Sequence, residues 1–226
     1  MSTLNSLITD AGDSGFLLPM ALAGVAMLWV YHSRRLAWLL LRSVLLAAGL
    51  ILVLKVLFLS CGGHWVPGLV SPSGHACLSA VVYGTLGTVL AAGRPPQVRR
   101  LIGIVAVGFI ALIAVTRLTL AVHTPLEVLI GLGVGALAQW WFARSYARME
   151  PIAVDLRRFG AALALTVVVA FGARLPAESF IRHVARRIAF SCESAARGAA
   201  PVAPAAPQGA RSRTRRSSAS ERAVWS

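Results

Sequence analysis

The chain has 226 residues, of which 57% are hydrophobic and 13% are charged, and its formal net charge is +14. Its mean hydropathy of +0.73 means that most of its length prefers lipid to water, which excludes an ordinary soluble globular protein. The composition predicts an integral membrane protein and leaves no room for a second, soluble domain.

Six apolar segments follow one another along the chain. Each is close to the roughly 17 to 25 residues that a spanning helix needs, so we expect an all-α, polytopic membrane bundle of about six transmembrane helices. The sequence before Phe16 has no Lys or Arg, unlike the start of a cleavable signal peptide, so we expect the first helix to be retained. The segments are Phe16–Tyr31, Leu36–Leu59, Ala76–Ala92, Leu101–Val115, Leu126–Ala143 and Phe159–Ala173.

Arginines mark one side of these expected helices. They lie in alternate connecting loops, whereas residues 1–15, 60–71 and 118–124 contain no Lys or Arg. Because positive charge in short loops resists translocation, we expect the arginine-bearing face to be cytoplasmic and the protein to be a multi-pass protein of a bacterial inner membrane. The arginines are Arg34, Arg35, Arg94, Arg99, Arg100, Arg144, Arg148, Arg157 and Arg158.

The end of the chain is basic and poor in large apolar residues. Prolines precede an arginine-rich run at 211–218, so we expect residues 176–226 to form a largely disordered tail that attracts anionic headgroups rather than nucleic acid. Six crossings would leave the arginines at its start outside, so either the last apolar segment is re-entrant or the tail is long enough to escape the charge rule. The expected organisation is an extracytoplasmic N-terminus (1–15), a transmembrane domain (16–175) and this tail.

Three cysteines lie far apart in the sequence. Cys61, Cys77 and Cys192 have no paired spacing, so neither a zinc site nor a disulfide framework is indicated. Cys61 and Cys77 flank one loop, so a bridge between them stays open, but we prefer to interpret them as small buried apolar residues.

Glycines in two of the expected helices are interpreted as packing positions. Gly84 and Gly87 lie in the third helix, and Gly131, Gly133 and Gly135 lie in the fifth. Because glycine lets helix backbones approach closely, we expect these helices to pack around a site.

Ionisable side chains at membrane depth are few, and chemistry is expected among them because each is costly there. Over residues 14–149 the only acidic side chain is Glu127. Three basic residues, Lys55, Arg117 and Arg42, lie outside the expected cytoplasmic loops. Arg42 is one turn into its helix, so its side chain can snorkel to the cytoplasmic surface. Lys55 and Arg117 instead lie near the outer ends of the second and fourth expected helices.

The sequence Pro72-Ser73-Gly74-His75 comes just before the third apolar segment. The N–H groups and positive dipole of a helix start would form an anion site there, to which Ser73 adds a hydroxyl and Gly74 a close backbone approach. His75 could give a proton to a leaving oxygen. The alternative is that Ser73 is only an N-cap and Pro72 only a loop residue.

A second polar cluster comes before the fifth apolar segment. His123 and Glu127 are four residues apart at a helix start, so the carboxylate can hold one nitrogen of the imidazole and leave the other to attack. Alternatively, Thr124 and Glu127 form a capping box with Pro125 at the first helical position. Both can hold, and capping explains neither His123 nor Arg117.

These residues resemble the type 2 phosphatidic acid phosphatase (PAP2) family. That family has a Lys-led first motif, then Pro-Ser-Gly-His, then Ser-Arg, five residues, His, three residues and Asp. Here Pro72–His75 gives the complete second motif, and Thr116-Arg117, His123 and Glu127 keep the spacing of the third, with Thr for Ser and Glu for Asp. Lys55 fits the start of the first motif.

The first motif departs further from the family pattern. Gly62-Gly63 stands where the family has Arg-Pro, so one phosphate-gripping cation is missing. His64 is a possible partial substitute, although a histidine beside Trp65 is more often an interfacial residue.

The resemblance implies that residues 16–175 are a catalytic domain that hydrolyses a lipid phosphomonoester or pyrophosphate through a phosphohistidine. His123 would attack phosphorus, Glu127 would orient it, and His75 would protonate the leaving oxygen. Lys55, Ser73, Gly74 and Arg117 would hold the phosphoryl oxygens. No metal or other cofactor is implied.

Two other classes of function remain open. The chain could be a phosphotransferase that passes the phosphoryl group to another lipid, or a non-catalytic relative that binds phospholipid. The expected partners are a lipid phosphate substrate and membrane lipids. Phosphatidate, phosphatidylglycerol phosphate and polyprenyl pyrophosphate present the same anion at the same depth, so the sequence does not choose among them, nor does it give the oligomeric state.

Overall fold

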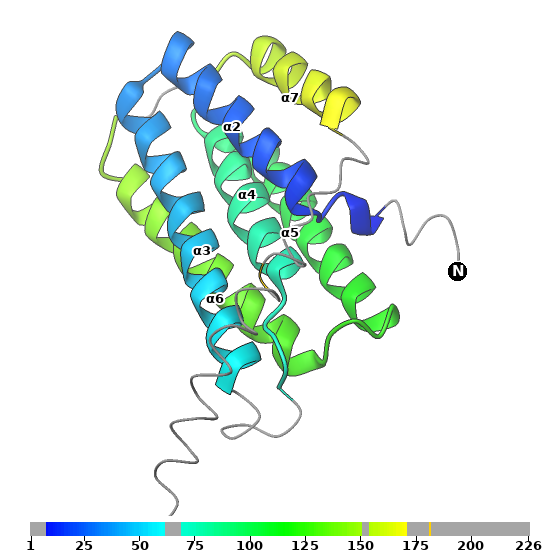
Figure 1. Ribbon diagram of the computed structural model, residues 1–226. Coiled ribbons are helices and arrows are strands. Elements are labelled where there is room, and N and C mark those ends of the chain that lie inside the picture. Colours follow the sequence, from blue (N-terminus) through cyan, green and yellow to red (C-terminus); the bar gives the residue numbers. More distant parts are fainter. Residues whose placement is uncertain (1–7, 62–68, 151–153, 171–180, 182–226) are drawn as a thin grey trace, which may run out of the picture.

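The computed structural model describes residues 8–61, 69–150, 154–170 and residue 181. Within these ranges the chain forms helices and no strands, which confirms the all-α prediction (Figure 1). The helices are α2 (Ser14–Tyr31), α3 (Arg34–Cys61), α4 (Gly74–Ala91), α5 (Pro96–Thr119), α6 (Pro125–Tyr146) and α7 (Leu156–Ala170).

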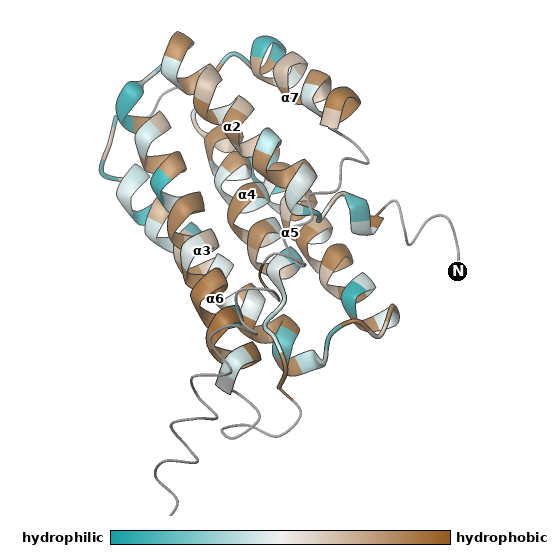
Figure 2. Ribbon diagram, viewed as in Figure 1, coloured by the Kyte–Doolittle hydropathy of each residue, from teal (hydrophilic) through white to brown (hydrophobic). Residues whose placement is uncertain are grey.

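Five of these helices, α2 to α6, are long and apolar enough to cross a membrane. Each contains or overlaps one of the first five apolar segments, so those predictions are confirmed. Large apolar side chains point outward along them, for example Leu101, Ile104 and Val107 on α5. Figure 2 shows the same pattern, with hydrophobic residues along the helices and hydrophilic ones concentrated toward their ends.

The sixth apolar segment, Phe159–Ala173, is described only as far as Ala170, so the sixth crossing stays a prediction. Its described residues belong to α7, which runs from Leu156 to Ala170. α7 packs against α2, with Phe159 buried near Gly24, while Val168 and Val169 point outward (Figure 1). The expected tail, residues 176–226, lies outside the described residues except for Ile181.

Helix α4 lies at the centre of the bundle, in contact with α2, α3, α5 and α6. Of its candidate span 67% is buried, against 22% for α5. Cys77 is free and fully buried on α4, as the interpretation of a small apolar residue predicted. The side chain of Cys61, and all of Cys192, lie outside the described part of the chain.

Glycines set the approach of α4 to α6. A methyl group at Gly131 would collide with the carbonyl oxygen of Ser73, and one at Gly135 with that of Cys77. The packing prediction is confirmed at both positions and wrong for Gly133, where a methyl group would meet nothing within 4 Å. The two helices that begin with the polar motifs are therefore held together by backbone contact at the motif end.

Gly84 and Gly87 on α4 also face neighbours. A methyl group at Gly84 would collide with the side chain of Gln139, and one at Gly87 would lie 3.2 Å from the side chain of Ala106. Their prediction as packing positions is confirmed.

Candidate active site

The second motif forms the start of α4. Ser73 is the N-cap, and its hydroxyl accepts a hydrogen bond from the N–H of Ala76 at 3.4 Å. Its own N–H donates to the carbonyl of Glu127 at 3.0 Å, which ties the start of α4 to α6. The capping interpretation of Ser73 therefore holds, and the same geometry presents the positive end of the α4 dipole at this end of the bundle.

The third motif forms the start of α6. His123 Nδ1 lies 3.0 Å from Glu127 Oε2, and both side chains are largely buried. The capping box is present as well, because Thr124 Oγ1 accepts from the N–H of Glu127 at 3.3 Å and Glu127 Oε2 accepts from the N–H of Thr124 at 3.0 Å. Both interpretations of Glu127 hold together.

Glu127 also reaches the segment that leads into the second motif. Its Oε1 atom accepts hydrogen bonds from the N–H groups of Val70 at 2.8 Å and Ser71 at 2.7 Å. One carboxylate thus orients His123, caps α6 and holds the chain just before α4. Sequence reasoning found the first two contacts from spacing, but no local pattern indicates the third.

Lys55 enters the site from α3. It is 4% exposed, and its Nζ atom donates to Ser71 Oγ at 3.4 Å. A methyl group at Gly74 would lie 3.2 Å from Lys55 Cε, so glycine allows the lysine to lie against the first residue of α4. The structure therefore brings Lys55 to the helix start that was predicted as an anion site. Gly62-Gly63 and His64 lie outside the described residues.

Arg117 lies in the last turn of α5, in a buried position. Its Nη2 atom donates to Thr9 Oγ1 at 2.7 Å, while its buried Nε atom has no hydrogen-bond partner among the described residues. The preceding Thr116 donates its hydroxyl to the carbonyl of Ile113 at 2.7 Å, a bond within α5. Arg117 thus contacts the N-terminal segment, a neighbour that the motifs did not predict.

The segment before α2, residues 8–13, lies against the candidate site. Asp13 Oδ2 is 3.4 Å from His75 Nε2, and the hydroxyl of Tyr83 on α4 donates to the carbonyl of Ala11 at 2.9 Å. Sequence reasoning missed these residues because its search for acidic groups began at Ser14. The available signal was Asp13 itself, an N-cap residue type placed directly before an apolar helix.

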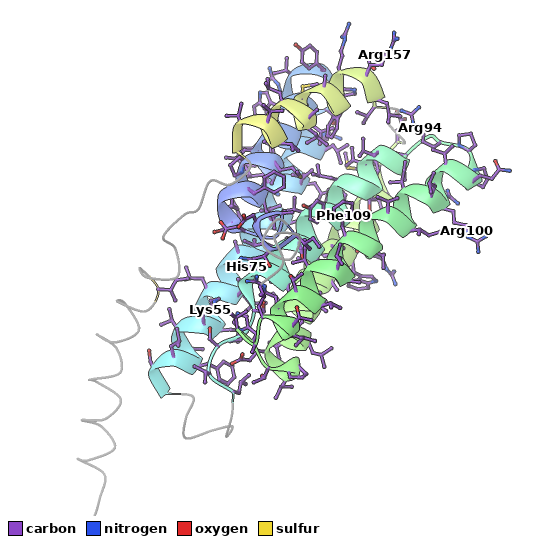
Figure 3. The ribbon with its side chains drawn as sticks, turned by 90° about the vertical axis from the view of Figure 1, so that its right-hand side faces the viewer. Lys55, His75, Arg94, Arg100, Phe109 and Arg157 are labelled. Atoms are coloured by element: carbon purple, nitrogen blue, oxygen red, sulfur yellow. The ribbon has the colours of Figure 1, made fainter. Side chains whose placement is uncertain are left out.

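The candidate residues, Arg117 among them, thus gather at one end of the bundle, and arginines of the connecting loops lie at the other. Figure 3 shows Arg94 and Arg157 at one end and Lys55 and His75 toward the opposite end. Arg144 and Arg42 stack on Trp140 and Trp38, with centroid distances of 5.0 Å and 5.7 Å. Among the described residues, no group of three or more His, Cys, Asp or Glu side chains could hold a metal ion.

The described residues form a helical bundle with five potential membrane crossings, as in a polytopic membrane protein. Histidines, carboxylates and buried cations gather at one end of this bundle and form a candidate catalytic centre. Residues 59–150 match the family model of the PAP2 superfamily. The matched segment contains the second and third motifs, and Lys55 lies just before it. Searches of curated proteins and of solved structures found no match to the chain.

Proposed function

We propose that this protein is a membrane lipid phosphatase that hydrolyses a lipid phosphomonoester or pyrophosphate through a phosphohistidine intermediate. The observation that carries the proposal is the contact of His123 with Glu127, whose other oxygen holds the segment leading into α4. Because Glu127 engages Nδ1, the opposite ring nitrogen, Nε2, is the one suited to attack phosphorus.

The first chemical step forms a bond between His123 Nε2 and phosphorus and breaks the bond from phosphorus to the leaving oxygen. The leaving oxygen takes a proton from His75 and departs as the lipid alcohol, or as a lipid monophosphate when the substrate is a pyrophosphate. Glu127 stabilises the positive charge that develops on the His123 ring. Its backbone hydrogen bonds keep the carboxylate in place while this happens.

The second step returns both histidines to their starting states. A water molecule attacks phosphorus, the bond to His123 breaks, and His75, now neutral, accepts the proton that the water loses. Inorganic phosphate is released. The two steps together use only side chains of this protein and consume one water molecule per turnover.

The phosphoryl oxygens would be held by the buried cations and the start of α4. Lys55 lies against Gly74, and the N–H groups at the start of α4 and the hydroxyl of Ser73 add donors. Arg117 has a buried Nε atom without a partner among the described residues, so it retains a donor for an anion. Such fixed donors are worth several kcal/mol of transition-state stabilisation.

We further propose that the site opens to the extracytoplasmic side of a bacterial inner membrane. The end of the bundle that carries Lys55 and His75 is opposite to the end that carries Arg94 and Arg157 (Figure 3). Positively charged loops stay on the cytoplasmic side, which leaves the site on the other face. A lipid phosphate in the outer leaflet would meet the site at headgroup depth.

The test is phosphate release by the purified full chain in detergent, with a chelator present. The substrates are phosphatidate, phosphatidylglycerol phosphate and a polyprenyl pyrophosphate, assayed with the parent chain and His123→Ala. We expect turnover of at least one substrate by the parent and none by the variant. His32→Ala is the matched control, because His32 follows α2 at its C-terminal end and should leave turnover unchanged.

The intermediate is tested by quenching the reaction with alkali, in which phosphohistidine survives and an acyl phosphate does not. A substrate labelled at the reacting phosphoryl group should label the parent chain and not His123→Ala. Label that appears on an acceptor lipid instead of in inorganic phosphate would identify a phosphotransferase. Binding of these lipids with no phosphate released would identify a non-catalytic binder, and unchanged turnover by His123→Ala would refute the mechanism.

A further inference from the structure

The N-terminal segment brings a second carboxylate to a second histidine. Asp13 Oδ2 lies 3.4 Å from His75 Nε2, and the two side chains are 19% and 26% exposed. This ion-pair distance parallels the contact of Glu127 with His123 in the same site. The motif pattern provides no partner for His75, and none of the three motifs contains Asp13.

Asp13 is held in place by the start of α2. Its Oδ1 atom accepts a hydrogen bond from the N–H of Gly15 at 2.7 Å, and its carbonyl accepts from the N–H of Leu17 at 2.8 Å. One oxygen of the carboxylate therefore serves as the N-cap while the other points to His75. The side chain has a fixed position that does not depend on the contact with the histidine.

The chain before Asp13 is fastened to two other helices. Tyr83 on α4 donates to the carbonyl of Ala11 at 2.9 Å, and Arg117 on α5 donates to Thr9 at 2.7 Å. Gly12 packs so closely that a methyl group there would lie 2.6 Å from the side chain of Ile113 and 3.5 Å from His75. Residues 8–13 therefore pack beside His75 and are held there by contacts with α2, α4 and α5.

A carboxylate in this position matches what the reaction requires of His75. A general acid must hold its proton-bearing nitrogen toward the leaving oxygen, and a carboxylate fixed beside the other nitrogen keeps the ring from turning away. The contact also fixes the ring by engaging Nε2, so that Nδ1 is the nitrogen that hands its proton to the leaving oxygen. After the transfer, the neutral ring keeps Asp13 as a partner and can accept the proton of the attacking water.

We infer that Asp13 is a positioning residue of the proposed reaction: its carboxylate holds the His75 ring in the orientation needed to protonate the leaving oxygen. The inference rests on the proposed phosphatase function and adds to it a residue outside the family motifs. It makes the N-terminal segment part of the catalytic site.

Asp13→Asn tests this role because asparagine is as good an N-cap as aspartate but carries no charge. The variant should keep α2 intact and lose only the effect on His75. The matched control is Asp155→Asn, which changes an aspartate at the start of α7 whose Oδ1 atom accepts from the N–H of Arg157 at 2.9 Å. Both variants are made in the full chain and compared by their thermal unfolding midpoints in detergent.

The readout is a pair of substrates with the same alkyl tail, an alkyl phosphate and an alkyl-substituted nitrophenyl phosphate. The alkoxide leaving group needs a proton, whereas the nitrophenolate leaves without one. We expect kcat of Asp13→Asn to fall about tenfold to a hundredfold on the alkyl phosphate, less than twofold on the aryl phosphate, with KM nearly unchanged for both. Asp155→Asn should match the parent on both substrates.

Other outcomes overturn the assignment. Equal losses on the two substrates would mean that Asp13 supports the fold or binding rather than the acid, and unchanged kcat on both would mean that the contact has no role. A rise in activity would mean that the carboxylate competes with the substrate phosphate. If the parent released phosphate from neither substrate nor from the lipid panel, the proposed function itself would fall, and this assignment with it.

Discussion

Replacing Glu127 by glutamine should damage catalysis far more than folding. The carboxylate accepts from Val70 and Ser71 at Oε1, and meets Thr124 and His123 at Oε2. An amide has one acceptor oxygen and one NH₂ group. The orientation that conserves most bonds places its oxygen toward Val70 and Ser71 and its NH₂ group toward the other two partners.

In that orientation His123 can still bond the amide, but only if its Nδ1 atom becomes the acceptor. The proton then sits on Nε2, the nitrogen that must attack phosphorus, so the ring is in the wrong tautomer. In a serine protease, the corresponding change beside the catalytic histidine lowers kcat by about 10⁴. We expect a loss of about the same size here.

The folding penalty is smaller, because one donor, the N–H of Thr124, is left facing another donor. Because Thr124 is exposed and its bond to Glu127 is only partly buried, the cost lies below the roughly 1 to 3 kcal/mol of a fully buried unsatisfied donor. The assay is phosphate release together with thermal unfolding in detergent, with Glu150→Gln as the control at an exposed position. Turnover by Glu127→Gln within tenfold of the parent, in a folded protein, would refute the role of Glu127 in fixing the tautomer.

Two further predictions concern the helix contact and the buried lysine. Gly131→Ala places a methyl group against the carbonyl of Ser73, and should lower the free energy of unfolding by about 1 to 3 kcal/mol and reduce turnover. Gly133→Ala is the control and should change neither quantity, because a methyl group there meets nothing within 4 Å. Equal unfolding midpoints for the two variants would contradict the packing argument. Lys55→Met removes a buried cation beside the start of α4 and should lower kcat/KM by about 10² to 10³. Arg42→Met, at the opposite end of α3, should leave kcat/KM unchanged, and equal losses in the two variants would argue against a phosphate contact at Lys55.

Much of the fold could be predicted because a membrane helix leaves a strong local signal. Five of six apolar segments correspond to helices able to cross a membrane, since length and hydropathy alone decide that property. The sixth segment extends past Ala170, the last described residue of α7, so its crossing stays a prediction.

The candidate site was predictable where it depends on spacing and not where it depends on tertiary contact. The His123–Glu127 pair follows from residues four apart on a helix, and the capping box from Thr124 three residues before Glu127. The contact of Asp13 with His75 joins residues 62 positions apart, and no local pattern indicates it. Gly131 and Gly133 look alike in the sequence, and only the packing of α4 shows that one faces a backbone and the other does not.

The hydrogen bonds that Glu127 accepts from Val70 and Ser71 bear on the order in which the protein assembles. The chain is synthesised from its N-terminus, so Val70, Ser71 and α4 are made before Glu127. The bonds that hold Val70 and Ser71 can form only after α6 has docked beside α4. Under the proposed function, a partly inserted chain would have its phosphate-binding residues but no oriented nucleophile, and newly made protein would gain the capacity to react with membrane lipids only at a late stage of assembly.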